Sequence, residues 1–142
     1  MTFTIRTASL ADVAAMHAVR LAVRENRLSD RRRVTAASYR RYVAAGTSWV
    51  AATANHDLLG FAALDRGKAS VWALFVHPDH EGIGVGRALH DTMLGWARRH
   101  GIGALSLVTA SGTRAERFYL GAGWSKRDAT GPAETRFEKL LV

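Results

Sequence analysis

The sequence contains no cysteine and only two prolines in 142 residues. Without cysteine the chain cannot form disulfide bonds, thiolate metal sites or a cysteinyl intermediate. It also lacks an apolar run of the roughly 18–20 residues that a membrane-spanning helix needs. The first residues, Met1 to Arg6, do not show the basic and then apolar pattern of a signal peptide. We therefore expect a cytoplasmic protein with no membrane partner.

Acidic residues are scarce, because 12 Asp and Glu stand against 20 Lys and Arg and give a formal net charge of +8. A positive field attracts anions, so charge alone leaves a phosphate-bearing cofactor, an acidic substrate and nucleic acid open as partners. The chain has neither interleaved aromatic and basic residues nor a known reader motif for nucleic acid. We therefore do not expect nucleic acid as a partner.

Alternating apolar patterns predict one α/β domain over residues 1–142. The expected strands cover residues 3–7, 48–54, 58–65, 71–76, 105–109, 124–127 and 135–141. The expected helices run from Ser9 to about Glu25, from Thr35 to Gly46, from Val85 to Gly101 and from Arg114 to about Gly121. The near-continuous apolar runs 71–76 and 105–109 predict buried strands, the first covered on both faces.

The connections between these elements predict the type of sheet. A strand, a helix and a strand within residues 71–109 require a parallel pair, whereas the hairpins require antiparallel pairs. The predicted fold is therefore an α+β mixed sheet of about six to seven strands flanked by about four helices.

The segment Glu81-Gly82-Ile83-Gly84-Val85-Gly86-Arg87 lies between a predicted strand and a long helix. Its alternate glycines let the backbone approach a ligand closely, and the N–H groups and dipole of a helix N-terminus favour an anion. The segment lacks the Gly-Lys-Ser/Thr of a Walker loop and the third small residue of a dinucleotide fingerprint, which argues against NAD. A phosphate or pyrophosphate is the natural ligand, and a tight turn without ligand is the alternative.

Two segments carry more specific motifs. Residues 76–89 contain Val-His-Pro followed by Glu-Gly-Ile-Gly-Val-Gly, and residues 114–124 contain Ala-Glu-Arg-Phe-Tyr and Gly-Trp. They resemble motifs A and B of the GNAT superfamily of acyl-CoA-dependent N-acetyltransferases, and Ile5 to Ala8 with Asp12 resembles the family's start. This resemblance covers the whole chain. It implies the GNAT fold and transfer of an acetyl group from acetyl-CoA to a primary amine of a small molecule, or of a peptide, by direct attack in a ternary complex.

The resemblance also implies the residues of the site. Those expected to bind acetyl-CoA lie on the central strand, the glycine loop and the later helix: Leu74, Phe75, Val76, Glu81, Gly82, Ile83, Gly84, Val85, Gly86, Arg87, Arg114, Phe118 and Tyr119. Tyr119 would protonate the leaving thiolate, with a plain core aromatic as the alternative. The Val76 N–H would donate to the carbonyl oxygen, which gains charge during attack.

Three positions depart from the family pattern. Glu81 stands where Gln or Arg is usual, Gly112 where Asn is frequent, and Trp72 where many relatives carry a glutamate base. An alkyl amine has a pKa near about 10.4 and must lose a proton to attack. Since Trp72 accepts no proton, the base is unassigned, with Glu25, His77 and bulk neutral amine as candidates. Trp72 also keeps a second function open, that of a non-catalytic acyl-CoA-binding or regulatory module.

The run His77-Pro78-Asp79-His80-Glu81 contains residue types that bind metals. Zinc needs about four converging ligands, so we expect an exposed loop and no metal. No motif identifies the acceptor amine, which the first two helices and the last strands would contact. A homodimer remains open.

Overall fold

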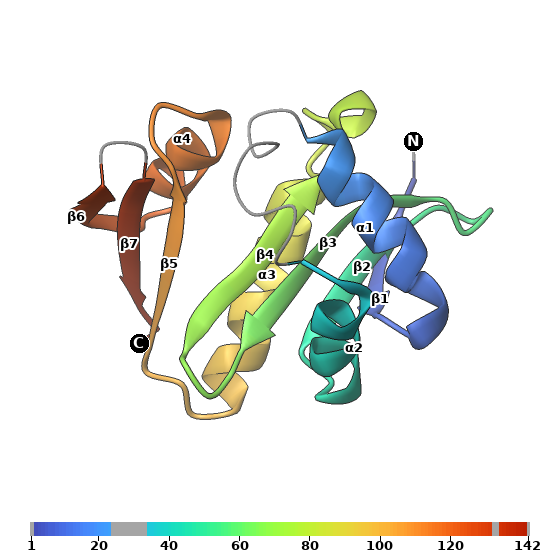
Figure 1. Ribbon diagram of the computed structural model, residues 1–142, viewed down its shortest axis with the longest axis horizontal. Coiled ribbons are helices and arrows are strands. Elements are labelled where there is room, and N and C mark those ends of the chain that lie inside the picture. The colour runs from blue at the N-terminus through green and yellow to red at the C-terminus, as the bar shows by residue number, and fades with distance from the viewer. Residues whose placement is uncertain (1, 24–33, 132–133, 142) are drawn as a thin grey trace.

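The computed structural model describes residues 2–23, 34–131 and 134–141. Seven strands form one sheet in the order β1-β2-β3-β4-β5-β7-β6 (Figure 1). They are β1 (Thr4–Thr7), β2 (Ser48–Ala52), β3 (Leu58–Asp65), β4 (Ser70–Val76), β5 (Ala104–Ala110), β6 (Ser125–Gly131) and β7 (Glu134–Leu140). Strands β4 and β5 are parallel and all other neighbours are antiparallel, which confirms the predicted mixed sheet.

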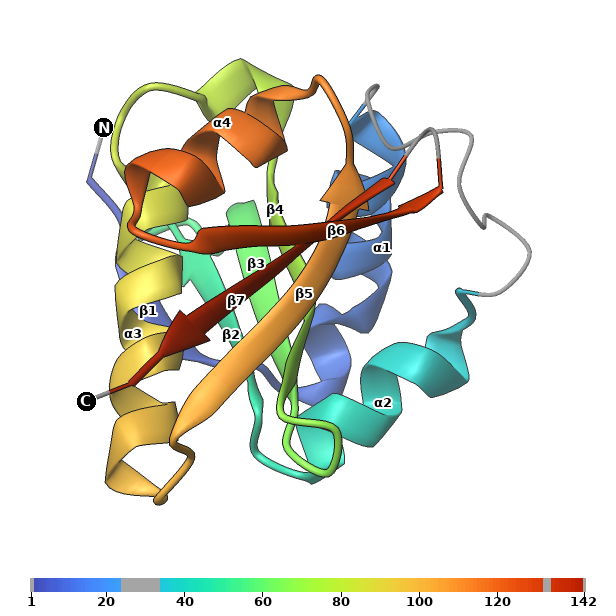
Figure 2. The ribbon, with the colours of Figure 1, turned by 90° about the vertical axis from the view of Figure 1, so that its left-hand side faces the viewer.

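Helices cover both faces of the sheet, as predicted (Figures 1 and 2). Helices α1 (Val13–Ala22) and α2 (Ala36–Ala44) pack on one face, α3 (Val85–Arg99) packs on the other, and α4 (Arg114–Gly121) contacts β5. The core is accordingly split in two, with Met16 and Tyr39 on the α1 side and Leu89 and Met93 on the α3 side. Within the described ranges no helix is long and apolar enough to cross a membrane.

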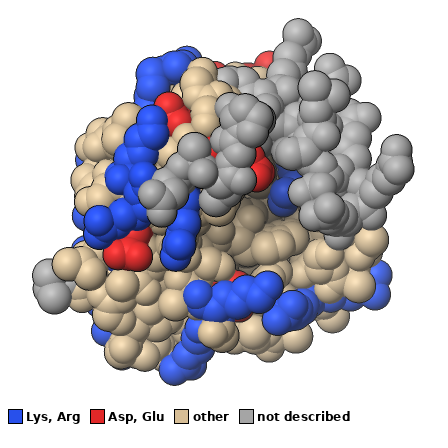
Figure 3. Space-filling view, turned by 60° about the vertical axis from the view of Figure 1, so that its left-hand side comes forward, with Lys and Arg blue, Asp and Glu red and all other residues tan. Residues whose placement is uncertain are grey.

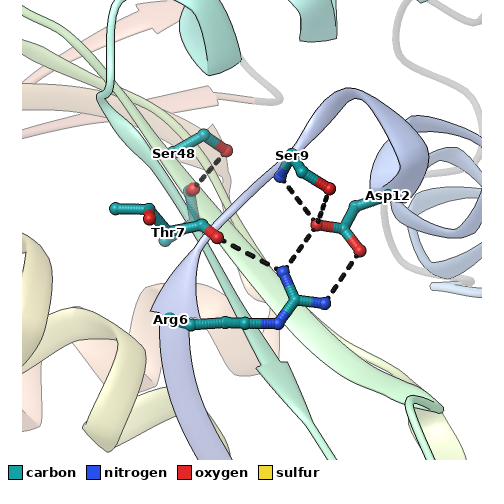
Figure 4. A network of polar contacts seen from close by, with 6 residues as sticks. Arg6, Thr7, Ser9, Asp12 and Ser48 are labelled. Atoms are coloured by element: carbon teal, nitrogen blue, oxygen red, sulfur yellow. Dashed lines mark hydrogen bonds and ion pairs between the residues drawn. The ribbon is translucent and has the colours of Figure 1, made fainter.

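An ion pair fixes the start of α1 to β1. The Asp12 carboxylate forms a capping box with Ser9 and accepts from both terminal nitrogens of Arg6, at 2.8 and 3.0 Å (Figure 4). The Arg6 hydrogen bonds, helped by the Ser9 N–H, hold the pKa of Asp12 below its usual value. The helix ends at Ala22 because Val23 is extended, at φ −78° and ψ 106°. The prediction of a helix to Glu25 is therefore wrong, and Glu25 itself lies outside the described residues.

Strand β4 departs from the prediction. It pairs with β3 along its length, but its single register pair with β5 is Ser70 with Ser106. Beyond that pair the two strands separate, so the prediction of burial on both faces is wrong and only Ala73 of β4 is fully buried. The register between β3 and β4 also shifts, because Ala63 pairs with Ala73 while the next residue, Leu64, pairs with Val71. Trp72 is therefore the extra residue of a β-bulge.

Strand β5 also differs from the prediction of a fully buried strand. Its burial alternates, and Val108 is 50% exposed. One face of β5 is therefore exposed next to the gap between β4 and β5.

Candidate active site

A cavity of about 300 Å³ lies where the end of β4, the glycine loop, the start of α3 and α4 meet. It is lined by every residue that the sequence predicted to contact acetyl-CoA except Ile83: Leu74, Phe75, Val76, Glu81, Gly82, Gly84, Val85, Gly86, Arg87, Arg114, Phe118 and Tyr119. Ile83 is instead 43% exposed on the outside of the loop. Three further residues line the cavity, namely Val23, His80 and Ala115.

The glycine loop leaves backbone donors facing this cavity. Gly84, at φ +90°, is the residue preceding α3 and has no side chain to cap it. The first helical bond runs from the Ala88 N–H to the Gly84 carbonyl. The amides of residues 85–87 therefore have no acceptor within the helix. Their N–H groups and the helix dipole suit an anion.

Glu81 and Arg114 form an ion pair across the cavity. Glu81 follows the 3₁₀ turn Pro78–His80, and Arg114 opens α4 just after Thr113, whose hydroxyl accepts from the Glu116 N–H. The carboxylate that departs from the family pattern thus has a basic partner from a distant part of the chain. Both side chains are partly exposed, at 38% and 60%.

The edge of β4 that faces away from β3 is unpaired near the cavity. The His77 N–H donates to the Leu59 carbonyl at 2.8 Å. Since hydrogen-bonded and non-bonded residues alternate along an antiparallel pair, Phe75 also bonds toward β3. The N–H groups of Leu74 and Val76 therefore point into the gap between β4 and β5.

Tyr119 lies at the wall of the cavity with its ring in the core. Only 5% of the residue is exposed, and its ring contacts those of Phe118, Trp124 and Phe137 at centroid distances of 5.4, 5.5 and 6.1 Å. Burial raises the pKa of its hydroxyl well above the usual value. The hydroxyl is protonated at neutral pH, as in any tyrosine, and burial makes it a weaker acid.

Of the residues considered as bases, Glu25 lies outside the described residues. His77 does not line the cavity, and its Nδ1 accepts from the Asp79 N–H at 3.1 Å. The Trp72 ring faces α2, packed against Tyr39 and Tyr42 at 5.4 and 4.8 Å. Among the described residues that line the cavity, only Glu81 carries a carboxylate.

Sequence reasoning missed His80, which lines the cavity while His77 does not. The two rings lie 5.6 Å apart, and the turn that begins at Pro78 directs them differently. Pro78 was the available signal, because proline favours the first position of a helical turn. In the part of the chain that the structure describes, no three His, Asp or Glu side chains are grouped to hold a metal ion.

The fold has close structural relatives. An acetyltransferase of the GNAT family from Staphylococcus aureus aligns with a TM-score of 0.84 at 16% identity, over 99% of this chain and 100% of that one. Ard1 from Thermoplasma volcanium aligns with a TM-score of 0.83 at 18% identity, over 100% and 99%. A putative acetyltransferase from Salmonella typhimurium, solved with its cofactor acetyl-CoA, aligns with a TM-score of 0.79 at 23% identity, over 100% and 95%.

No curated protein matches the sequence. The model of the acetyltransferase (GNAT) family, however, matches residues 14–124, from the first helix through the glycine loop to Trp124. Because this match spans most of the chain, the protein belongs to the acetyltransferase (GNAT) family.

Proposed function

We propose that the protein is an N-acetyltransferase that moves the acetyl group of acetyl-CoA to a primary amine by direct attack in a ternary complex. The observation that carries this proposal is the unpaired edge of β4. The N–H groups of Leu74 and Val76 face a gap beside the glycine-loop cavity. Such an edge suits an extended, amide-bearing ligand that adds to the sheet like a strand.

The residues around the cavity fit acetyl-CoA. The amides of residues 85–87 and the glycines before them would hold the pyrophosphate, with Arg87 and Arg114 as nearby cations. Leu74 and Val76 would pair with the amides of the pantetheine arm. When bound, acetyl-CoA supplies a thioester. The Salmonella relative with bound acetyl-CoA has the same fold, which supports this assignment.

Two groups of the chain would act on the thioester. The Val76 N–H would donate a hydrogen bond to the carbonyl oxygen as negative charge develops there. The Tyr119 hydroxyl, which like any tyrosine hydroxyl is protonated at neutral pH, would give its proton to the departing sulfur.

The proton of the amine has no carboxylate acceptor on β4, because Trp72 stands there and packs against α2. We propose that the amine reaches the site neutral from bulk solvent, or that it loses its proton through water. Glu25 lies outside the described residues. Because His80 lines the cavity, it joins His77 as a candidate histidine that would accept the proton of the amine through a water molecule.

The packing of Trp72 also favours a second candidate function, a non-catalytic acyl-CoA-binding module. Calorimetry with acetyl-CoA and release of free thiol across a panel of amines would separate the two. Turnover with any amine supports the transferase, and binding without turnover supports the module. Absence of acetyl-CoA binding would contradict both. The cytoplasmic location expected from the sequence stays a prediction.

A further inference from the structure

A second cavity, of about 420 Å³, lies on the α2 side of the sheet, between α2 and β5. It is lined by Arg41 and Tyr42 of α2, by Lys68 of the turn before β4, by Ser70 to Trp72 of β4, and by Ser106 of β5. Figure 3 shows Lys and Arg side chains on two sides of a hollow in this face. The proposed reaction gives this cavity no role so far.

The lining of this cavity is rich in hydrogen-bond donors. Arg41 and Lys68 contribute positive charge, and Arg41 is 68% exposed. The hydroxyls of Ser70 and Ser106 make no hydrogen bond to any residue in the described ranges. Two cations and two available hydroxyls match the chemistry that binds a carboxylate or phosphate.

The one carboxylate among the described lining residues belongs to Asp65, and it is already engaged. Its Oδ1 accepts from the Lys68 N–H at 3.0 Å and its Oδ2 from the Tyr42 hydroxyl at 3.1 Å. The Arg41 guanidinium is farther from it, at 3.8 Å. Arg41 therefore keeps donors that are available to a ligand.

Strand β4 connects the two cavities. Ser70 to Trp72 line the second cavity, and Leu74 to Val76 line the first. At about 3.3 Å per residue, Trp72 lies about 13 Å and Ser70 about 20 Å from Val76 along the strand. The β4–β5 ladder stops at Ser70 and Ser106, so no strand pairing divides the two cavities beyond that point.

We propose that the second cavity binds an anionic group of the acceptor, so that the preferred acceptor is an amine with a carboxylate about 13–20 Å from its nitrogen. This inference rests on the proposed transferase function, which places the reacting nitrogen near Val76. The anion would lie between Arg41 and Lys68, with Ser70 and Ser106 as further donors. A cationic second group would be repelled there.

The test compares amines that differ in one group. In 12-aminododecanoate the nitrogen and the carboxylate are about 15 Å apart in the extended chain, whereas 12-aminododecanamide has the same length and no charge. We expect a KM at least about tenfold lower for the carboxylate, because two cations face it. The short 3-aminopropanoate should lose this advantage, since it cannot reach both cavities. Equal KM values for the two long amines would overturn the inference and leave the transferase function intact.

Matched variants locate the effect. Arg41→Gln and Lys68→Gln should each raise the KM for 12-aminododecanoate. Arg98→Gln, which removes the same charge from the exposed end of α3 on the other face of the sheet, should not. An equal effect of all three variants would assign the preference to net charge and overturn the site.

A binding measurement keeps the inference separate from catalysis. Calorimetry would titrate 12-acetamidododecanoate and 12-acetamidododecanamide into the protein in the presence of CoA. Tighter binding of the carboxylate, lost in Arg41→Gln, supports the site even if the proposed transfer fails. Equal binding of the two compounds overturns it.

Discussion

Trp124 donates its indole N–H to Nε2 of the buried His90 across 3.0 Å. This bond needs an unprotonated Nε2, so the ring proton sits on Nδ1, which faces Asp91 Oδ1 at 2.9 Å. Burial lowers the pKa of His90, and Arg87 and Lys139 add to that effect while Asp91 opposes it. Phe118 of α4 and Trp124, which follows α4, both contact the His90 ring. These contacts hold α3 against α4, the helix that carries Tyr119.

His90 should make the fold sensitive to acid. In the unfolded chain it takes up a proton near its ordinary pKa of 6.5, whereas the fold resists that proton. The free energy of unfolding should therefore fall as the pH drops below about 6.5. In His90→Gln, which does not titrate, this fall should be smaller. Urea unfolding at pH 7.5 and pH 5 would measure it, with the exposed His100→Gln as control. Equal pH dependence in the wild type and His90→Gln would contradict the assignment.

Tyr119→Phe should lower kcat and leave acetyl-CoA binding unchanged. The substitution keeps the ring contacts with Trp124 and Phe137 and removes only the hydroxyl. A positioned general acid contributes about a hundredfold or more, although the low pKa of a thiol reduces this, so we expect a loss of about tenfold. Single-turnover kinetics and calorimetry would measure the two quantities. Undiminished kcat with chemistry rate-limiting would make Tyr119 a core residue only.

Gly84→Ala should weaken CoA binding by at least about tenfold, or 1.4 kcal/mol. The added Cβ meets no protein atom within 4 Å and so extends into space at the cavity. The backbone at φ +90° also strains any side chain, by about 1–2 kcal/mol. Gly101→Ala is the matched control, because Gly101 has φ +76°, open surroundings and a place at the far end of α3. Both variants should lose similar stability. Equal CoA affinity in the two would remove the glycine loop from the binding site.

Glu81→Gln should strengthen CoA binding by about two- to fivefold at low salt, with a smaller gain at high salt. The substitution removes a negative charge from the cavity and releases Arg114 from its ion pair. Arg114→Gln should have the opposite effect on the dissociation constant. Asp57→Asn, an exposed acid in the turn before β3, controls for net charge. Weaker binding by Glu81→Gln would mean that the pair positions Arg114 for the ligand.

The rise of kcat/KM with pH should continue up to the pKa of the amine. Trp72 provides no base on β4, so the fraction of neutral amine sets the rate. Two amines of different pKa should give two different limbs in a pH–rate profile. A limb at the same pH for both amines, which disappears in His80→Ala or His77→Ala, would identify a histidine base instead.

The order of strands and helices and the parallel pair followed from local patterns in the sequence. Apolar periodicity and glycine positions act within a few residues, so the start of α3 at Val85 and the turn before it were predictable. Most residues of the cavity were also predictable, because motif segments 74–87 and 114–119 meet there.

Other features depend on contacts between distant segments. The bulge at Trp72 arises because Ala63 and Leu64 of β3 pair with the residues on either side of Trp72. The separation of β4 from β5 depends on both of those strands. The Arg114–Glu81 pair joins the start of α4 to the segment that follows the 3₁₀ turn Pro78–His80. No local pattern encodes these relationships, so the sequence could not predict them.

The separation of β4 and β5 leaves two internal sheet edges with unpaired backbone groups facing each other. Unpaired edges ordinarily recruit strands from other chains and lead to aggregation. Here the edges lie within the molecule, beside a cavity that the glycine loop and α4 line. An extended ligand added between them would pair with these backbone groups and so remove a place where another chain could add a strand.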